Sequence, residues 1–105
     1  MPTAKLGIEE RVDGDNHTLL LTGELDIAGA EPFERTVWRL CREGAKEIVL
    51  DLRELAFLDS IGYRAILATK TLCEEYDCAF YMTRAREPVQ RLFDLTGMLR
   101  RLPFR

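Results

Sequence analysis

Residues 47–76 read EIVLDLRELAFLDSIGYRAILATKTLCEEY, and this stretch contains the transition that decides the fold. Residues 47–52 are almost continuously apolar, which predicts a central strand buried on both faces. A second apolar segment, 55–58, follows it. Asp59 and Ser60 come next, directly before apolar residues at helical spacing that continue to Tyr76. The stretch therefore predicts a buried strand whose chain turns at Asp59 and Ser60 into a long helix.

The segments on either side continue this alternation of strands and helices. Further strands are predicted over 6–12, 18–22 and 79–82. Further helices are predicted over 30–43 and 88–95. The order β-β-α-β-α-β-α predicts an α/β fold with a mixed sheet of four to five strands, mostly parallel, and helices packed on it. We expect residues 1–105 to form a single domain.

Prolines and glycines mark the ends of the two flanking helices. Pro32 and Pro88 are expected in first turns, where a missing N–H does no harm. Gly44 and Gly97 are expected at the C-terminal ends. A last extended stretch is expected within 98–105.

Composition and charge narrow the classes of function. Apolar residues make up 47% and charged residues 31% of the chain, which is ordinary globular usage. The formal charge of −3 argues against a general nucleic-acid binder. Residues 84–105 carry a local excess of arginine, for which a solvated basic face is preferred over an acidic partner or an anionic membrane. The opening residues lack a secretory pattern and no apolar run is long enough to span a bilayer, so a cytoplasmic protein without membrane contact is expected.

The cysteines and the histidine point away from metal or redox chemistry. Cys41, Cys73 and Cys78 lie in or beside apolar stretches and form no CxxC motif, which is typical of reduced, buried thiols. His17 is the only histidine, so a zinc site or a histidine-dependent catalytic triad lacks its parts. No cofactor is expected, and nucleotide-binding glycine motifs are absent.

Ser60 is predicted at the N-cap of the helix that runs to Tyr76. A serine oxygen there accepts a hydrogen bond from a free N–H of the first turn, and this structural role alone accounts for many such serines. The same position suits a phosphoserine, because free N–H groups and the helix dipole favour an anion. A phosphate beside Asp59 would create a strongly negative local charge that could prevent a partner protein from binding this surface. Gly62 would leave space near the hydroxyl, or be a tolerated helix glycine.

Residues 57–62, FLDSIG, resemble the phosphorylation motif of the STAS family, in which an Asp-Ser-Ser/Thr-Gly segment follows an apolar strand and opens a helix. Three further segments resemble the family in the same order: 21–26 (LTGELD), 48–52 (IVLDL) and 92–98 (LFDLTGM). The likeness spans roughly residues 6–104. Within the family, the sequence is similar in particular to the bacterial anti-sigma factor antagonists.

The resemblance implies a switch based on partner exchange. Unphosphorylated protein would bind an anti-sigma factor that is itself a serine kinase, and so release a sigma factor. The kinase would then phosphorylate Ser60, the complex would dissociate, and a serine phosphatase would reset the switch. Carried over by position, the partner-binding residues are Glu24, Asp26, Asp59, Ile61, Gly62 and Arg64. Asp51 would end the adjoining strand, and the protein would be a regulatory binding protein rather than an enzyme. Its oligomeric state stays open between a monomer and a weak dimer.

The chain also departs from the family pattern. Ile61 stands where a small hydroxyl residue is common, so it offers no alternative acceptor, and Tyr63-Arg64 places a large cation beside the site. Two other functions remain open. One is a constitutive STAS adaptor in a lipid-transport or stressosome-like assembly. The other is an enzyme or nucleotide sensor, although no histidine or cysteine pairs sensibly with Ser60 for acyl transfer.

Overall fold

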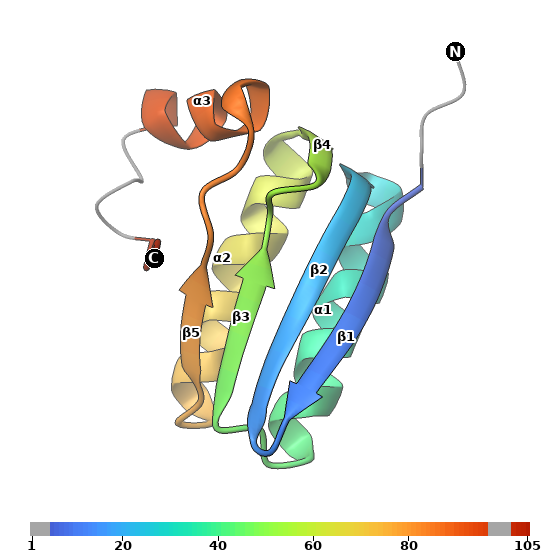
Figure 1. Cartoon of the computed structure of the whole chain (residues 1–105). Helices are drawn as coiled ribbons and strands as arrows, with labels where there is room; N and C mark the ends of the chain where they lie inside the picture. The colour runs from blue at the N-terminus through green and yellow to red at the C-terminus, as the bar shows by residue number, and fades with distance from the viewer. Residues whose placement is uncertain (1–4, 97–101) are drawn as a thin grey trace.

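Strands and helices alternate along most of the chain in the computed structural model, which describes residues 5–96 and 102–105 (Figure 1). The strands are β1 (Gly7–Asp13), β2 (Asn16–Leu25), β3 (Glu47–Asp51), β4 (Leu55–Leu58) and β5 (Ala79–Met82). The helices are α1 (Ile27–Arg42), α2 (Ser60–Glu75) and α3 (Glu87–Thr96). The predicted α/β class and its mixed, mostly parallel sheet are confirmed.

The sheet has the order β1-β2-β3-β5, with β4 paired to β2 off this path. β1 and β2 form an antiparallel hairpin, whereas the β2–β3, β3–β5 and β2–β4 pairs are parallel. β2 runs through Leu25, three residues beyond its predicted end, and shifts register between Gly23 and Glu24. Gly23 has φ 78°, a conformation that costs glycine little. This shift lets β2 leave β3 and pair with β4, a strand missing from the predicted order.

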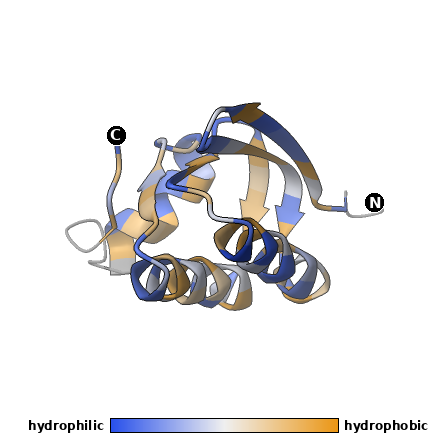
Figure 2. Cartoon of the chain, turned by 90° about the horizontal axis from the view of Figure 1, so that it is seen from below, coloured by the Kyte–Doolittle hydropathy of each residue, from blue (hydrophilic) through white to orange (hydrophobic). Residues whose placement is uncertain are grey.

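α1 and α2 lie side by side on one face of the sheet, and α3 lies near the edge where β4 ends (Figures 1 and 2). The core lies between these two helices and the sheet. Its largest fully buried side chains include Leu19, Leu21, Phe33, Ile48 and Leu50. Alternate residues of β2 and β3 therefore face the helices, as the two-residue period of a strand requires.

α1 begins earlier than predicted. Asp26 caps it, because its Oδ1 accepts hydrogen bonds from the N–H groups of Ala28 (3.0 Å) and Gly29 (3.2 Å). Pro32 consequently lies inside the helix and not in its first turn, so the predicted position was wrong. The helix loses the one hydrogen bond that an N–H at position 32 would donate.

The other predicted ends agree with the structure where it describes them. Gly44 follows α1 with φ 92°, and Pro88 is the second residue of α3. Gly97 and most of the predicted final stretch lie outside the described residues, but Phe104 forms a parallel bridge with Met82. Among the described residues, no helix combines the length and apolarity that a membrane span requires.

Candidate functional site

Two parallel strands end together at one edge of the sheet, and each continues directly into a helix. Leu25 of β2 pairs with Leu58 of β4. Asp26 follows the first strand and Asp59 the second, and each aspartate is the N-cap of the next helix. The N-termini of α1 and α2 therefore emerge at the carboxyl edge of the sheet, where open α/β sheets commonly present their sites.

Ser60 is the first residue of α2, and the prediction that it is the N-cap was wrong. Asp59 takes that position, and its Oδ1 accepts a hydrogen bond of 2.8 Å from the N–H of Gly62. Asp59 has extended backbone angles and a carboxylate, so it makes the capping interaction one residue earlier. The Ser60 side chain is exposed, and its hydroxyl has no capping bond to maintain. Ser60 is also the only serine in the chain.

Gly62 holds the start of α2 tightly against the end of β2. A Cβ atom at this position would lie 2.0 Å from the carbonyl oxygen of Leu25 and 2.8 Å from a side-chain carbon of Leu58. Gly62 is buried, so the absent side chain serves close packing and does not clear space around the Ser60 hydroxyl. Its conformation is that of an ordinary helix, and the approach of the two backbones is what requires glycine here.

Exposed apolar side chains lie near the ends of β2 and β4, on the segments that lead into α1 and α2. Ile27, the first residue of α1, is 72% exposed, while Phe57 of β4 and Ile61 of α2 are 41% and 40% exposed. The sequence-based prediction included Ile61 but missed Ile27 and Phe57. The signal was available, since both residues are large and apolar, and Ile27 directly follows Asp26 while Phe57 lies two residues before Asp59. Large apolar groups left in water at a strand edge are typical of a surface that docks a partner.

Glu24 lies at the same edge, opposite Phe57 in the β2–β4 ladder. Its Oε2 atom is buried, yet none of the described residues donates a hydrogen bond to it. A buried carboxylate oxygen without a donor is costly, so Glu24 is the one acidic residue of this edge with an unsatisfied acceptor among the described residues.

Arg64 lies one helical turn beyond Ser60. The two residues are four apart on α2, which places them on neighbouring parts of one helix face. Arg64 is exposed, and it forms no ion pair within the described part of the chain. Its guanidinium is therefore free to meet an anion on Ser60 or an acidic group of a partner.

Asp51 does not lie with the residues around Ser60. It fixes the segment that connects β3 to β4. Its carboxylate accepts two bonds from the Arg53 guanidinium, at 2.9 and 2.7 Å, and one from the Arg53 backbone N–H at 3.1 Å. These hydrogen bonds to Arg53 hold the pKa of Asp51 below its usual range, although partial burial opposes the shift. Thr83 also donates to Asp51 at 3.4 Å, and its oxygen accepts from the N–H of Leu52 at 2.8 Å. Asp51 therefore ties the end of β3 to the segment after β5.

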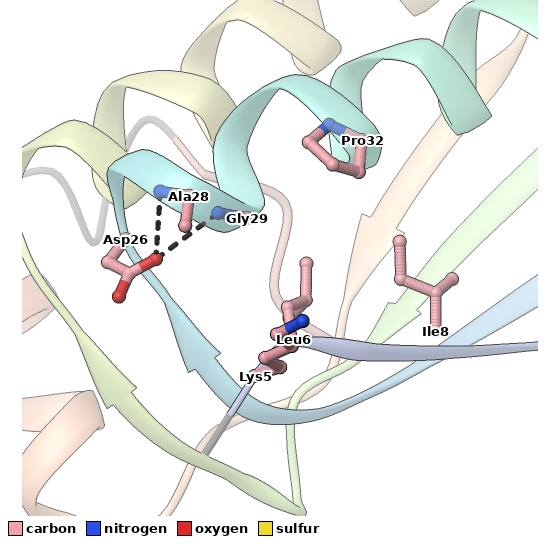
Figure 3. Close-up of a pocket in the computed structure, with 7 residues that line it drawn as sticks. All are labelled: Lys5, Leu6, Ile8, Asp26, Ala28, Gly29 and Pro32. Carbon is pink, nitrogen blue, oxygen red and sulfur yellow. Dashed lines mark hydrogen bonds between the residues drawn. The ribbon is translucent and has the colours of Figure 1, made fainter. Parts of the chain in front are cut away.

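A hollow of about 360 Å³ lies next to Asp26, between the start of β1 and the first turns of α1 (Figure 3). It is lined by Lys5, Leu6, Ile8, Asp26, Ala28, Gly29 and Pro32. The Asp26 carboxylate is occupied in capping α1, as the dashed lines of Figure 3 show. The hollow adjoins the carboxyl edge of the sheet through Asp26, and Ser60 is not among its lining residues.

A comparison with known protein families covers most of the chain. The family model of the STAS domain matches residues 8–105. The chain belongs to the STAS family. The resemblance inferred from the four sequence segments is thereby confirmed.

Several known proteins that are similar to this STAS protein are named anti-sigma factor antagonists. An anti-sigma-B factor antagonist of Staphylococcus epidermidis is 27% identical over 93 residues, covering 89% of this chain and 86% of the relative. An anti-sigma factor antagonist from Mycobacterium paratuberculosis has a similar structure, with a TM-score of 0.83, 23% identity and coverage of 95% and 85%. The Bacillus cell-fate determinant SpoIIAA in its phosphorylated form aligns with a TM-score of 0.71 and 20% identity over 95% and 90% of the two chains. At these identities the two structures establish the fold.

Proposed function

We propose that this STAS protein is an anti-sigma factor antagonist controlled by phosphorylation of Ser60. The unmodified protein binds an anti-sigma factor that is also a serine kinase, and thereby frees a sigma factor. Phosphorylation ends the interaction, and a serine phosphatase restores it. The observation that carries the proposal is the position of Ser60, which is exposed at the first residue of α2, at the edge of the sheet where Ile27, Phe57 and Ile61 are also exposed.

The surface around Ser60 combines the features of a partner interface. Ile27, Phe57 and Ile61 supply apolar area that loses water on docking. Glu24, Asp26 and Asp59 supply acidic groups at its margin, so an electropositive partner surface is expected. Gly62 contributes by holding the turn in place, and Arg64 stands within reach of a group attached to Ser60.

The proposed signal is electrostatic. A phosphate at Ser60 adds a charge of roughly −1.5 to −2 close to the carboxylate of Asp59. The free N–H groups of the first turn of α2 stabilise this anion within the folded chain. The partner, however, would have to bury a doubly charged group against a surface built to accept a neutral hydroxyl. Such an uncompensated charge costs several kcal/mol at an interface.

Phosphoserine analysis tests the acceptor directly. The purified chain is incubated with ATP and its cognate kinase, and the product is examined by intact mass and by phosphoserine detection. Because the chain has a single serine, any phosphoserine is assigned to position 60 without ambiguity. Ser60→Ala should abolish the label. Thr71→Ala is the matched control, since Thr71 is an exposed hydroxyl residue of α2 that bonds only its own helix, at Leu67.

The binding consequence is tested with charge variants. Ser60→Asp should weaken binding to the anti-sigma factor by roughly 30-fold or more, which corresponds to about 2 kcal/mol. Ser60→Ala should bind like the unmodified protein. Labelling that survives Ser60→Ala would refute the assignment. Stable association of both variants with a transport ATPase or a sensor scaffold, without labelling, would instead favour a constitutive adaptor.

A further inference from the structure

Three cysteines that are far apart in the sequence meet in the core, at the end of α2 opposite Ser60. Cys41 belongs to α1, Cys73 to α2, and Cys78 immediately precedes β5. Their Sγ atoms all lie within 4.8 Å of one another, and those of Cys41 and Cys73 are 3.8 Å apart. The three residues are 4%, 0% and 5% exposed, and none forms a disulfide. Cysteine usage alone predicted buried thiols, but the sequence did not reveal that they share one site.

The backbone brings these thiols together through the way that the helices end. The N–H of Cys78 donates to the carbonyl of Cys73 at 2.8 Å, and that of Asp77 donates to Glu74 at 3.3 Å. Asp77 has φ 54°. These features define a Schellman motif, in which the residue after the left-handed position packs on the residue that starts the motif. Cys78 and Cys73 hold those two positions. α1 ends in the same way at Gly44, and Cys41, in the last turn of α1, lies close to both of these cysteines.

The surroundings favour neutral sulfur. Burial raises the pKa of Cys78 to about 11, and it also raises the pKa values of Cys41 and Cys73 above their usual range. Near neutral pH the cluster therefore consists of three thiols. A zinc or copper(I) ion held by three thiolates would carry a net negative charge into this apolar site, and buried unpaired charge is costly.

The number of sulfur ligands also argues against a zinc site. Within residues 5–96 and 102–105, no histidine, carboxylate or fourth thiol joins the three cysteines. Structural zinc sites take four ligands, commonly from cysteine and histidine. An element that prefers three sulfur ligands and forms a neutral product fits the cluster better.

We propose that Cys41, Cys73 and Cys78 form a binding site for trivalent arsenic, which enters as neutral arsenous acid. Three As–O bonds break and three As–S bonds form. Each thiol proton leaves with one arsenic-bound hydroxide as water, so three waters are released and arsenic remains in the +3 state. No redox partner is needed and no net charge is created in the core. The residual exposure of Cys41 and Cys78 and local opening of the two helix ends provide entry.

Arsenic bound in this way would join α1, α2 and the start of β5. It would bind the folded state selectively, because only folding brings the thiols together, and it would raise the unfolding temperature by mass action. Cys73 lies thirteen residues along α2 from Ser60, or about 20 Å at the rise of an α-helix. Partner docking at the Ser60 edge is therefore expected to proceed with arsenic bound.

The test uses the reduced, full-length chain and arsenite. Native mass spectrometry should show one arsenic gained and three hydrogens lost. Ultraviolet absorbance from As–S bonds should titrate at one equivalent, and the unfolding temperature should rise. Cys78→Ser and Cys41→Ala are variants at the two least buried of the three cysteines. Each should lower the affinity for arsenite by at least roughly 10-fold, because only two of the three thiols remain to bind arsenic. Circular dichroism confirms that each variant is folded before it is titrated.

Three results would overturn the proposal. One is the absence of an adduct with the folded wild-type chain. Another is equal affinity in wild type and in both folded two-thiol variants, which would indicate ordinary dithiol chemistry. The third is stoichiometric binding of zinc or copper(I) at concentrations where arsenite does not bind, which would contradict the argument from neutral charge.

Discussion

Replacing Gly62 by alanine perturbs the contact that positions Ser60. The added Cβ would lie 2.0 Å from the Leu25 carbonyl oxygen, whereas real Cβ contacts stay above about 3 Å. The start of α2 must therefore move away from β2 by roughly 1 Å, and the obstacle is rigid backbone. Overpacking of this kind typically costs about 1–3 kcal/mol, and a backbone clash belongs at or above the upper end. Alanine regains at most about 1 kcal/mol of helix propensity.

The net expectation for Gly62→Ala is a loss of about 2 kcal/mol in the free energy of unfolding, measured by urea denaturation. Gly29→Ala is the matched control, because its added Cβ in the first turn of α1 would lie 3.0 and 3.1 Å from the Leu6 side chain and 3.3 Å from the Glu24 carbonyl oxygen, contacts that shifts of a few tenths of an ångström relieve. That variant should change stability by less than about 1 kcal/mol. Equal stabilities for the two variants, or a more stable Gly62→Ala protein, would refute the reasoning about close approach.

Three other substitutions test separate parts of the fold. Asp51→Asn should cost about 1–2 kcal/mol at neutral pH, because it removes the charged acceptor of the Arg53 bonds. The pKa of Asp51 is lowered in the folded state. The contribution of its charged form to the free energy of unfolding is therefore complete above the usual pKa of 3.8 and disappears as the pH falls through the folded pKa. Urea midpoints should therefore differ at pH 7 and converge in acid, and a constant difference would contradict the ion pair. Asp77→Gly should stabilise the protein by about 0.5–1 kcal/mol by relieving its φ of 54°, and a lower thermal midpoint would argue against that strain. Asp59→Ala should cost about 1 kcal/mol through loss of the α2 cap while Asp59→Asn keeps most of the stability, and equal losses in thermal melts would exclude the capping role.

Apolar periodicity sufficed to predict the order of the main elements, because continuous strands and amphipathic helices bury area in recognisable patterns. β4 was not predicted as a strand, since its pairing depends on the register shift at Gly23 and on the extra length of β2. The start of α1 was predicted too late, because Pro32 was assigned to the first turn of the helix. The hydrogen bonds that Asp26 provides outweigh the single bond lost at the proline.

The candidate site was predicted from local sequence where local sequence determines it. Asp59, Ser60 and Ile61 lie together because they are consecutive, and Glu24 and Asp26 join them because two parallel strands end at the same edge. The error of one residue at the N-cap came from two adjacent residues that can both cap a helix. The convergence of Cys41, Cys73 and Cys78 depends on how α1 and α2 pack, which no local pattern encodes.

The most direct test of the proposed switch compares one partner with two forms of one chain. The affinity of the anti-sigma factor is measured for the unmodified protein and for the same protein phosphorylated at Ser60, by calorimetry at fixed salt. The electrostatic account predicts that phosphorylation weakens binding by roughly 30-fold or more. Equal affinities for the two forms would contradict it.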